Sequence, residues 1–270
     1  MRLFRRRWFQ IFVSGLILLI LVERTLVATG DPNYVPSAIL LGAFLVPVTF
    51  TTYLYERLPD WDVPLPPVAI CFVWGGVLGT ALAGTFEYDV ARSLGFLPKL
   101  GIGFIEEGAK LILPLVLYFL GRYRSEAAGI VLGVATAMGF AALETMGYGL
   151  TSLLASHGNL GVLDEVLLAR GLTSPAGHAA WTGLVCAVLW RERLKAGHAT
   201  FNWRVGGAFG TAVILHALWD TFAGMSSTTF VGFVSIQLIS LLIALVGLTL
   251  LIRRVREARR ATEKGGGRVA

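Results

Sequence analysis

Seven ionisable side chains lie within four stretches of the chain that are otherwise apolar: Glu106, Glu107, Lys110, Glu144, His178, His216 and Asp220. Each stretch is long enough to cross a lipid bilayer, where an ionisable group is costly and usually functional. Carboxylates and imidazoles can move a proton or ligate a metal ion. The seven residues are therefore candidates for a single site that performs acid–base or metal chemistry.

Glu106, Glu107 and Lys110 share one face of a predicted helix, because residues three and four apart are neighbours on its surface. Two adjacent carboxylates repel each other in a medium of low dielectric, and the ammonium group offsets this repulsion. Such a trio can hold one carboxylate ionised near neutral pH, as a general base requires. We expect Glu106 or Glu107 to be that base and Lys110 to be its charge partner.

Two further pairs combine a candidate with a residue one helical turn later. The carboxylate of Asp220 can accept an imidazole N–H from His216 and so fix the tautomer of that ring. Tyr148 can donate a hydrogen bond to Glu144 in the same way. Asp220 and Tyr148 are therefore expected to support the site.

The composition indicates a membrane protein. The chain is 55% hydrophobic and only 15% charged, whereas soluble domains carry about 25% charged residues. Its mean hydropathy is +0.70. The net charge of +6 resides in the tails and short loops, where it sets topology and does not indicate a nucleic-acid partner. Cys71 and Cys186 show no spacing typical of a disulfide framework or a thiolate metal site.

We expect an all-α polytopic transmembrane helix bundle in a single domain over residues 1–270. The eight predicted spans are 8–28, 35–55, 67–86, 100–120, 127–154, 171–190, 205–224 and 230–252. With the N-terminus inside, the inner segments hold 18 Lys and Arg residues and the outer segments hold four. Both termini are therefore predicted to be cytoplasmic. Residues 253–270 are basic and then glycine-rich, and we expect a disordered tail.

The predicted depths of the candidates agree. At 1.5 Å per residue, the outer end of the span lies ~9 Å from Glu106, ~15 Å from Glu144 and ~11 Å from both His178 and His216. Four helices of alternating direction thus place polar groups in the outer half of the membrane, where we expect them to face one another. The Pro-Ala-Gly sequence before His178 predicts a local distortion that admits water or substrate. Arg170, near the outer end of the sixth span, is expected to be an interfacial anchor.

Four short motifs follow one another on consecutive predicted spans: EExxK at 106–110, FxxxE at 140–144, Pro-Ala-Gly-His at 175–178 and HxxxD at 216–220. In this order they resemble the PrsW family of intramembrane proteases, a branch of the group that includes CAAX-processing and bacteriocin-immunity proteins. The resemblance covers residues 100–224. CAAX-type members resemble EExxxR and FxxxH instead. Lys110 and Glu144 depart from that pattern, which argues against processing of prenylated proteins.

The resemblance implies hydrolysis of peptide bonds in membrane-anchored proteins, such as an anti-sigma factor, in the bacterial cytoplasmic membrane. Carried onto this chain, it implies that Glu106 or Glu107 activates water while Glu144, His178 and His216 complete the centre. Two mechanisms stay open. Glu144, His178 and His216 could hold zinc with an open position for water, or a glutamate base could act with two histidines that steady an oxyanion.

Two other classes of function also use buried carboxylates and imidazoles. One is a proton- or ion-coupled transporter, although the polar residues gather in four spans and show no repeat between the halves of the chain. The other is a membrane binder without catalytic activity, similar to immunity proteins. Lipid is the dominant partner in each case, and the sequence does not specify an oligomer.

Overall fold

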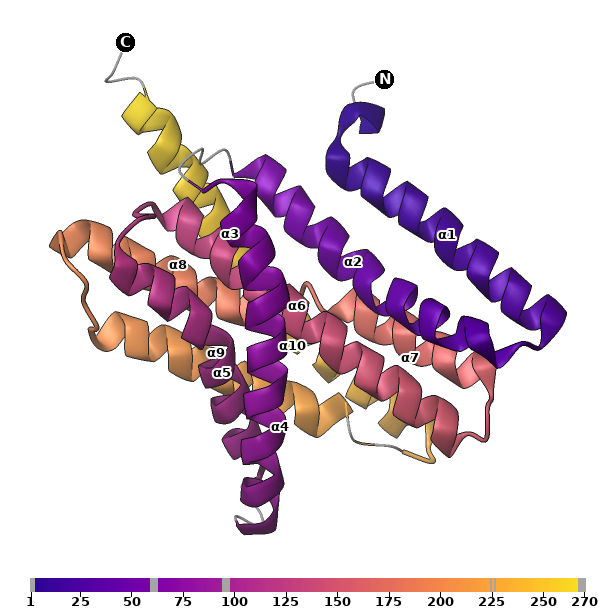
Figure 1. The fold of residues 1–270 in the computed structure, drawn as a ribbon. Coiled ribbons are helices and arrows are strands. Elements are labelled where there is room, and N and C mark those ends of the chain that lie inside the picture. Colours follow the sequence, from indigo (N-terminus) through magenta and orange to yellow (C-terminus); the bar gives the residue numbers. More distant parts are fainter. Residues whose placement is uncertain (1–2, 59–62, 94–97, 224, 226, 267–270) are drawn as a thin grey trace.

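The structure, a computed structural model, describes residues 3–58, 63–93, 98–223, 225 and 227–266, and these residues form helices and no strand (Figure 1). The elements in chain order are the 3-10 turn Leu3–Arg5, α1 (Arg7–Thr29), the 3-10 turn Pro32–Tyr34, α2 (Val35–Arg57), α3 (Leu65–Ile70), the π-helical turn η3 (Cys71–Gly75), α4 (Gly76–Ser93), α5 (Pro98–Leu120), α6 (Glu126–Ala155), α7 (Leu160–Thr173), α8 (His178–Ala196), α9 (Trp203–Ala223) and α10 (Phe230–Gly266). The predicted all-α class is confirmed.

The core is built around α6. The most apolar part of α6 is 94% buried inside the protein, whereas the corresponding part of α1 is 6% buried. Helices α2, α4, α7 and α8 all pack against α6, while α1 packs on α2 at the periphery (Figure 1). On the other side of the molecule α9 contacts α5, α8 and α10. The helices that carry the candidate residues therefore gather around one buried helix.

Close approach to α6 depends on glycine. A Cβ added to Gly139 would lie 1.8 Å from the carbonyl oxygen of Phe72 in η3, and one added to Gly76 would lie 2.6 Å from the carbonyl carbon of Gly139. The π-helical turn thus brings its backbone directly onto α6. By contrast, a Cβ on Gly206 or Gly210 in α9 would meet open space. Packing therefore requires glycine at the contact between η3, α4 and α6, but not at Gly206 or Gly210 in α9.

Five segments are long and apolar enough to cross a membrane: Arg7–Thr29, Pro32–Arg57, Leu65–Phe86, Glu126–Ala155 and Phe230–Ala261. Helices α5, α8 and α9 do not reach this criterion. Three ionisable residues interrupt α5, four charged residues end α8, and His216 and Asp220 lower the hydropathy of α9. The residues that mark the candidate site thus make their own helices less apolar. The count of eight spans and the cytoplasmic location of the termini stay predictions.

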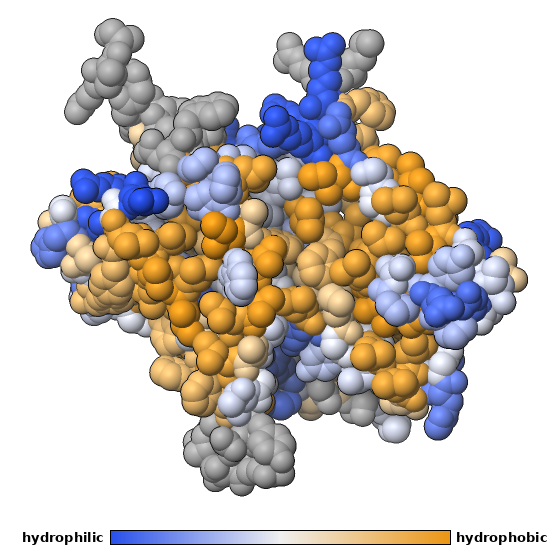
Figure 2. Space-filling view, viewed as in Figure 1, coloured by the Kyte–Doolittle hydropathy of each residue, from blue (hydrophilic) through white to orange (hydrophobic). Residues whose placement is uncertain are grey.

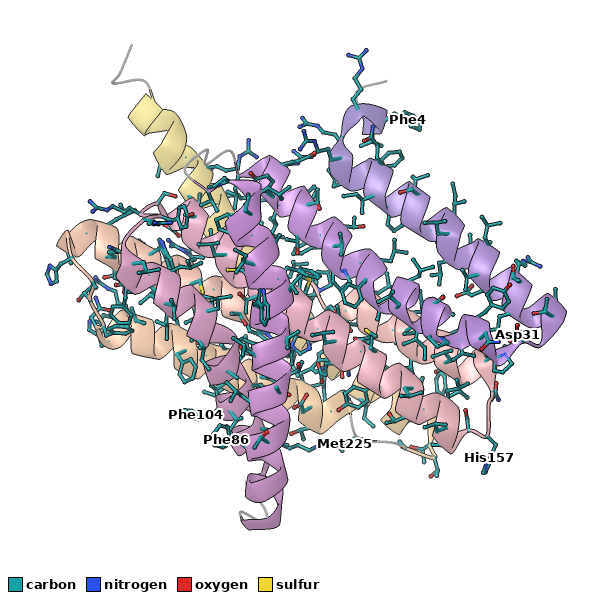
Figure 3. All side chains as sticks on the ribbon, viewed as in Figure 1. Phe4, Asp31, Phe86, Phe104, His157 and Met225 are labelled. Carbon is teal, nitrogen blue, oxygen red and sulfur yellow. The ribbon has the colours of Figure 1, made fainter. Side chains whose placement is uncertain are left out.

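The surface agrees with an integral membrane protein. Apolar residues cover most of the visible face, and hydrophilic residues gather towards its edges (Figure 2). Asp31 in the α1–α2 loop and His157 in the α6–α7 loop lie towards one end of the molecule, and Phe4 lies towards the other (Figure 3). The topology predicts both of these loops on the outer side of the membrane, and that location stays a prediction.

The structure divides the predicted span 171–190. Residues 160–173 form α7, which was not predicted, and residues 174–177 form a turn before α8 begins at His178. Pro175 lacks a backbone N–H and interrupts the helix. Leu163 and Leu167 of α7 pack with Ile39 of α2, so the segment between the predicted fifth and sixth spans is a packed helix. His178 is consequently the first residue of its helix and not a residue two turns inside it.

The C-terminal region also differs from the predicted disordered tail. Helix α10 continues to Gly266, and residues 267–270 lie outside the described residues. Arg254 is buried and forms ion pairs with Glu126, at the start of α6, and with Glu257. The ion pair with Glu126 thus holds the first turn beyond the predicted span against α6, whereas the pair with Glu257 lies within α10.

A second polar cluster joins the end of α8 to the start of α9. The buried carboxylate of Glu192, beyond the predicted span, accepts hydrogen bonds from Lys195 at 3.1 Å, Asn202 at 2.9 Å and Arg204 at 3.2 Å. Burial alone would raise the pKa of Glu192, but these hydrogen bonds outweigh it and hold the pKa at about 2. The carboxylate is therefore ionised at neutral pH and links α8 to the start of α9.

We expect Gly139→Ala to lower the thermal stability of the detergent-solubilised protein, because its methyl group would overlap the backbone of η3. Overpacking of this kind costs about 1–3 kcal/mol. Gly210→Ala is the matched control, and its melting temperature should be unchanged or higher because alanine favours helix. Equal melting temperatures for the two variants would contradict the close approach of η3 to α6.

Candidate functional site

Lys110 of α5 is the centre of a buried ion cluster. Its Nζ donates to Oε2 of Glu106 and to Oε1 of Glu107, each at 2.9 Å, and it also lies 4.2 Å from the centre of the Phe140 ring. The Lys110 side chain has no exposed surface. A buried ammonium requires such partners, because an unpaired charge at this depth would be strongly destabilising. The predicted charge pairing on α5 is therefore present.

Glu107 links three helices and has no accessible surface. Its Oε1 contacts Lys110 and Nδ1 of His216, the latter at 2.9 Å, and its Oε2 accepts a hydrogen bond from Thr182 at 2.9 Å. These contacts join α5 to α8 and α9. Both carboxylate oxygens are therefore occupied by protein groups.

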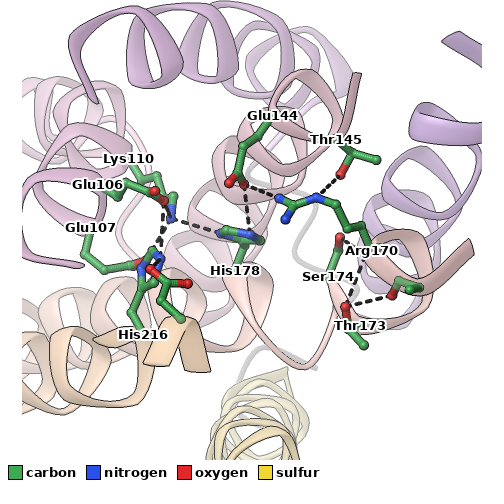
Figure 4. A network of polar contacts seen from close by, with 12 residues as sticks. Glu106, Glu107, Lys110, Glu144, Thr145, Arg170, Thr173, Ser174, His178 and His216 are labelled. Atoms are coloured by element: carbon green, nitrogen blue, oxygen red, sulfur yellow. Dashed lines mark hydrogen bonds and ion pairs between the residues drawn. The ribbon is translucent and has the colours of Figure 1, made fainter. Parts of the chain in front are cut away.

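His178 lies between the α5 cluster and a second ion pair (Figure 4). Its Nδ1 is 3.0 Å from Nζ of Lys110, and its Nε2 is 3.2 Å from Oε2 of Glu144. A protonated lysine can only donate, so Nδ1 accepts and the proton of a neutral ring resides on Nε2. The His178 ring thus presents an N–H towards Glu144.

Arg170 of α7 lies inside the site and is not the interfacial anchor that we expected. Its Nη2 is 2.7 Å from Oε2 of Glu144, and its Nε donates to Thr145 at 3.3 Å. The guanidinium also lies 4.0 Å from the centre of the Tyr148 ring. Tyr148 therefore stacks under Arg170, and no hydrogen bond joins it to Glu144 among the described residues. This role of Arg170 was not predicted because α7 itself was not predicted.

His216 of α9 is held by Glu107 more closely than by Asp220. Its Nδ1 is 2.9 Å from Glu107, while its Nε2 is 3.4 Å from Oε2 of Glu106 and 3.5 Å from Oδ2 of Asp220. The ring stacks on Trp181 with centroids 4.7 Å apart. Glu107 thus has the orienting role that the sequence assigned to Asp220, whose carboxylate contacts His216 only at the longer distance.

A cavity of about 660 Å³ opens beside these groups, and we call it the main cavity. Its charged and polar lining residues include Lys99, Glu106, Glu144, Tyr148, Arg170, His178 and Asp220. Glu107 and His216 are not part of the lining. The structure thus separates the adjacent glutamates, because Glu106 faces the cavity and Glu107 is enclosed by protein.

The structure brings together a metal-ligand set that differs from the predicted Glu144, His178 and His216. In the described part of the chain, ligating atoms of Glu106, Glu144 and His178 lie within 4.8 Å of one another. These two carboxylates and one imidazole could supply the three protein ligands of a catalytic zinc site, in which water takes the fourth position. Lys110 contacts two of these three residues, so a bound cation and the ammonium would compete for the same oxygen and nitrogen atoms.

Two residues that contact the site were missed in the sequence. Thr182 follows His178 by one helical turn, and that spacing placed it on the same face as the motif histidine. Trp181 packs against both imidazole rings, with centroids 5.7 Å from His178 and 4.7 Å from His216. An aromatic residue on an apolar helix carries no signal that distinguishes such a role from ordinary core packing.

Comparison with known proteins identifies a family over most of the chain. A family model described as PrsW family intramembrane metalloprotease matches residues 63–250. No curated protein and no solved structure matches the chain. The matched region contains every helix that contributes to the ion cluster and to the main cavity.

We expect Thr182→Val to destabilise the protein, because it leaves the buried Oε2 of Glu107 without its hydrogen-bond donor. Loss of one partner of a buried polar group costs about 1–3 kcal/mol. Thermal unfolding in detergent would measure the loss, and Thr182→Ser should retain the stability because it keeps the hydroxyl. Equal destabilisation by valine and serine would show that this hydrogen bond is unimportant.

Proposed function

Because the chain belongs to the PrsW family of intramembrane metalloproteases, we propose that it hydrolyses peptide bonds of membrane-anchored proteins in the main cavity. The observation that carries this proposal is the accessible group formed by Glu106, Glu144 and His178, with ligating atoms within 4.8 Å of one another at a cavity of about 660 Å³. Such a cavity is within the range of small-molecule sites and can admit a short extended peptide.

Glu106 is the residue that we assign as the general base. Its contacts with Lys110 and His216 both use Oε2, so Oε1 is the oxygen that we assign as the proton acceptor. Water attacks the peptide carbonyl carbon and gives its proton to this oxygen. The same proton then passes to the leaving nitrogen as the C–N bond breaks. Glu107 serves as a structural partner because its oxygens are occupied.

His178 and Arg170 are the electrophilic groups that we assign to the reaction. Both line the main cavity, where the carbonyl oxygen of the substrate becomes negatively charged in the tetrahedral intermediate. Glu144 holds the Nε2–H of His178 and the guanidinium of Arg170 at the cavity wall, and these donors turn from Glu144 towards the carbonyl oxygen as its negative charge develops.

Glu106, Glu144 and His178 are also the residues that would hold a divalent cation. A bound ion would supply a polarised water at this place. Glu144 would remain the link between that centre and Arg170, since its Oε2 contacts both His178 and Arg170.

The proposed function also includes a location in the membrane and a class of substrate. We assign the site to the outer half of a bacterial cytoplasmic membrane, as the positive-inside rule indicates. A regulatory single-span protein, such as an anti-sigma factor, is the class of substrate that the family resemblance favours.

We expect Glu106→Gln to reduce cleavage of a reconstituted single-span substrate by about 10²–10⁴-fold, the usual contribution of a general base. Its thermal stability should change less than that of Glu107→Gln, whose carboxylate links three helices. Glu165→Gln is the control, because Glu165 is exposed on α7 and lines no described cavity. Wild-type turnover in Glu106→Gln would contradict the assignment of the base.

We expect removal of metal by a chelator to abolish cleavage and added Zn²⁺ to restore it. Glu144→Gln should lower the metal content of the purified protein, because it replaces one of the three candidate ligands. Elemental analysis and calorimetric titration measure this effect without relying on turnover. Full activity in protein shown to be free of metal would establish a glutamate mechanism instead.

A further inference from the structure

A second cavity, of about 350 Å³, lies between α7, α8, α9 and α10, and we call it the α10 cavity. Six of its lining residues are Thr173, Ser174, Trp181, Phe222, Gln237 and Ser240. It is lined in part by α10, a helix with extensive apolar exposed surface. Because α10 presents apolar side chains to the surface, a substrate segment in the bilayer would approach the α10 cavity along this helix.

The two cavities share part of their walls. Four residues line both of them: Arg170, His178, Trp219 and Ala223. Two of these, Arg170 and His178, are the groups assigned to stabilise the reacting carbonyl. A peptide whose scissile bond lies at the shared wall can therefore extend from the main cavity into the α10 cavity.

A substrate segment that is extended in the α10 cavity, whose volume is about 350 Å³, loses its helical hydrogen bonds. Its freed backbone N–H and C=O groups then need other hydrogen-bond partners.

Gln237 and Ser240 can supply those partners. Gln237 is the one amide side chain between Phe230 and Ile252. Among the described residues, neither Gln237 nor Ser240 has a side-chain hydrogen bond, whereas Ser235 donates to the carbonyl oxygen of Val231 at 2.8 Å. The hydroxyl and the amide that line the cavity thus keep their capacity to bond to a ligand.

We propose that the α10 cavity is the subsite for the substrate residue next to the scissile bond, and that it selects a large apolar side chain. This inference rests on the proposed function. Trp181, Trp219 and Phe222 provide aromatic walls for that side chain, while Gln237 and Ser240 bond to the extended backbone beside it.

Substitutions that change the volume of the cavity test this selection. Ser240→Phe fills the cavity, Phe222→Ala enlarges it, and Ser235→Phe is the control because Ser235 is exposed on the same helix and lines neither cavity. The probes are model single-span peptides in liposomes, with Ala, Leu, Phe or Trp at each position flanking the cleaved bond.

The wild type and Ser235→Phe should prefer a large side chain at one flanking position. Ser240→Phe should shift that preference towards Ala by about tenfold or more, and Phe222→Ala should shift it towards Trp, as expected when pocket volume changes. Cleavage by the wild type with the same preference in all three variants would overturn the subsite.

A cross-linking experiment gives a result that does not require turnover. A photoreactive phenylalanine in place of Gln237, in the Glu106→Gln background, should cross-link to the peptides much more strongly than one in place of Ser235. Equal cross-linking at the two positions would overturn the inference. Selective cross-linking at position 237, with no cleavage by the wild type, would support the binding subsite and overturn the proposed function.

Discussion

The buried ammonium group of Lys110 is the constraint on which the other features depend. It lies with no exposed surface between two carboxylates, each 2.9 Å away. Removing Lys110 would leave two buried carboxylates without their cation, and removing either carboxylate would leave Lys110 with one anionic partner instead of two. The cluster therefore fixes α5, and Glu107 extends it to α8 and α9 through Thr182 and His216. Glu106 belongs to the same cluster and also lines the main cavity, so its ion pair with Lys110 holds its carboxylate at the cavity wall.

The helical fold was largely predictable, because long apolar stretches with polar interruptions are strong signals. The predicted segments 8–28 and 127–154 differ from α1 and α6 by one residue at each end. Helix α7 was not predictable in the same way. Its sequence mixes Asp164, Glu165 and Arg170 with leucines, and its packing against α2 and α6 makes it part of the core. The orientation in the membrane depends on lipid and is not a property of the fold alone.

The site was predictable as a set of residues and not as a network of contacts. Spacing along one helix correctly paired Lys110 with both glutamates, because that geometry is local. The contacts between helices depend on how each helix is rotated, which spacing does not determine. The predicted metal set contained His216, whereas the structure groups Glu106 with Glu144 and His178. Thr182 was missed for the same reason, whereas the role of Arg170 was missed because α7 was not predicted.

Helix α10 is held against the rest of the protein by an ion pair in its C-terminal part. Its described ion pairs all involve residues from Arg253 onwards, and Arg254 ties that end to the start of α6. Towards Phe230, its contacts with α8 and α9 are mainly those of apolar side chains. Lipid tails can replace such contacts at little cost in free energy, because they are as apolar as the side chains. The C-terminal part of α10 is thus held against α6 by charge, and the part that borders the α10 cavity is the part that can separate from its neighbours at least cost.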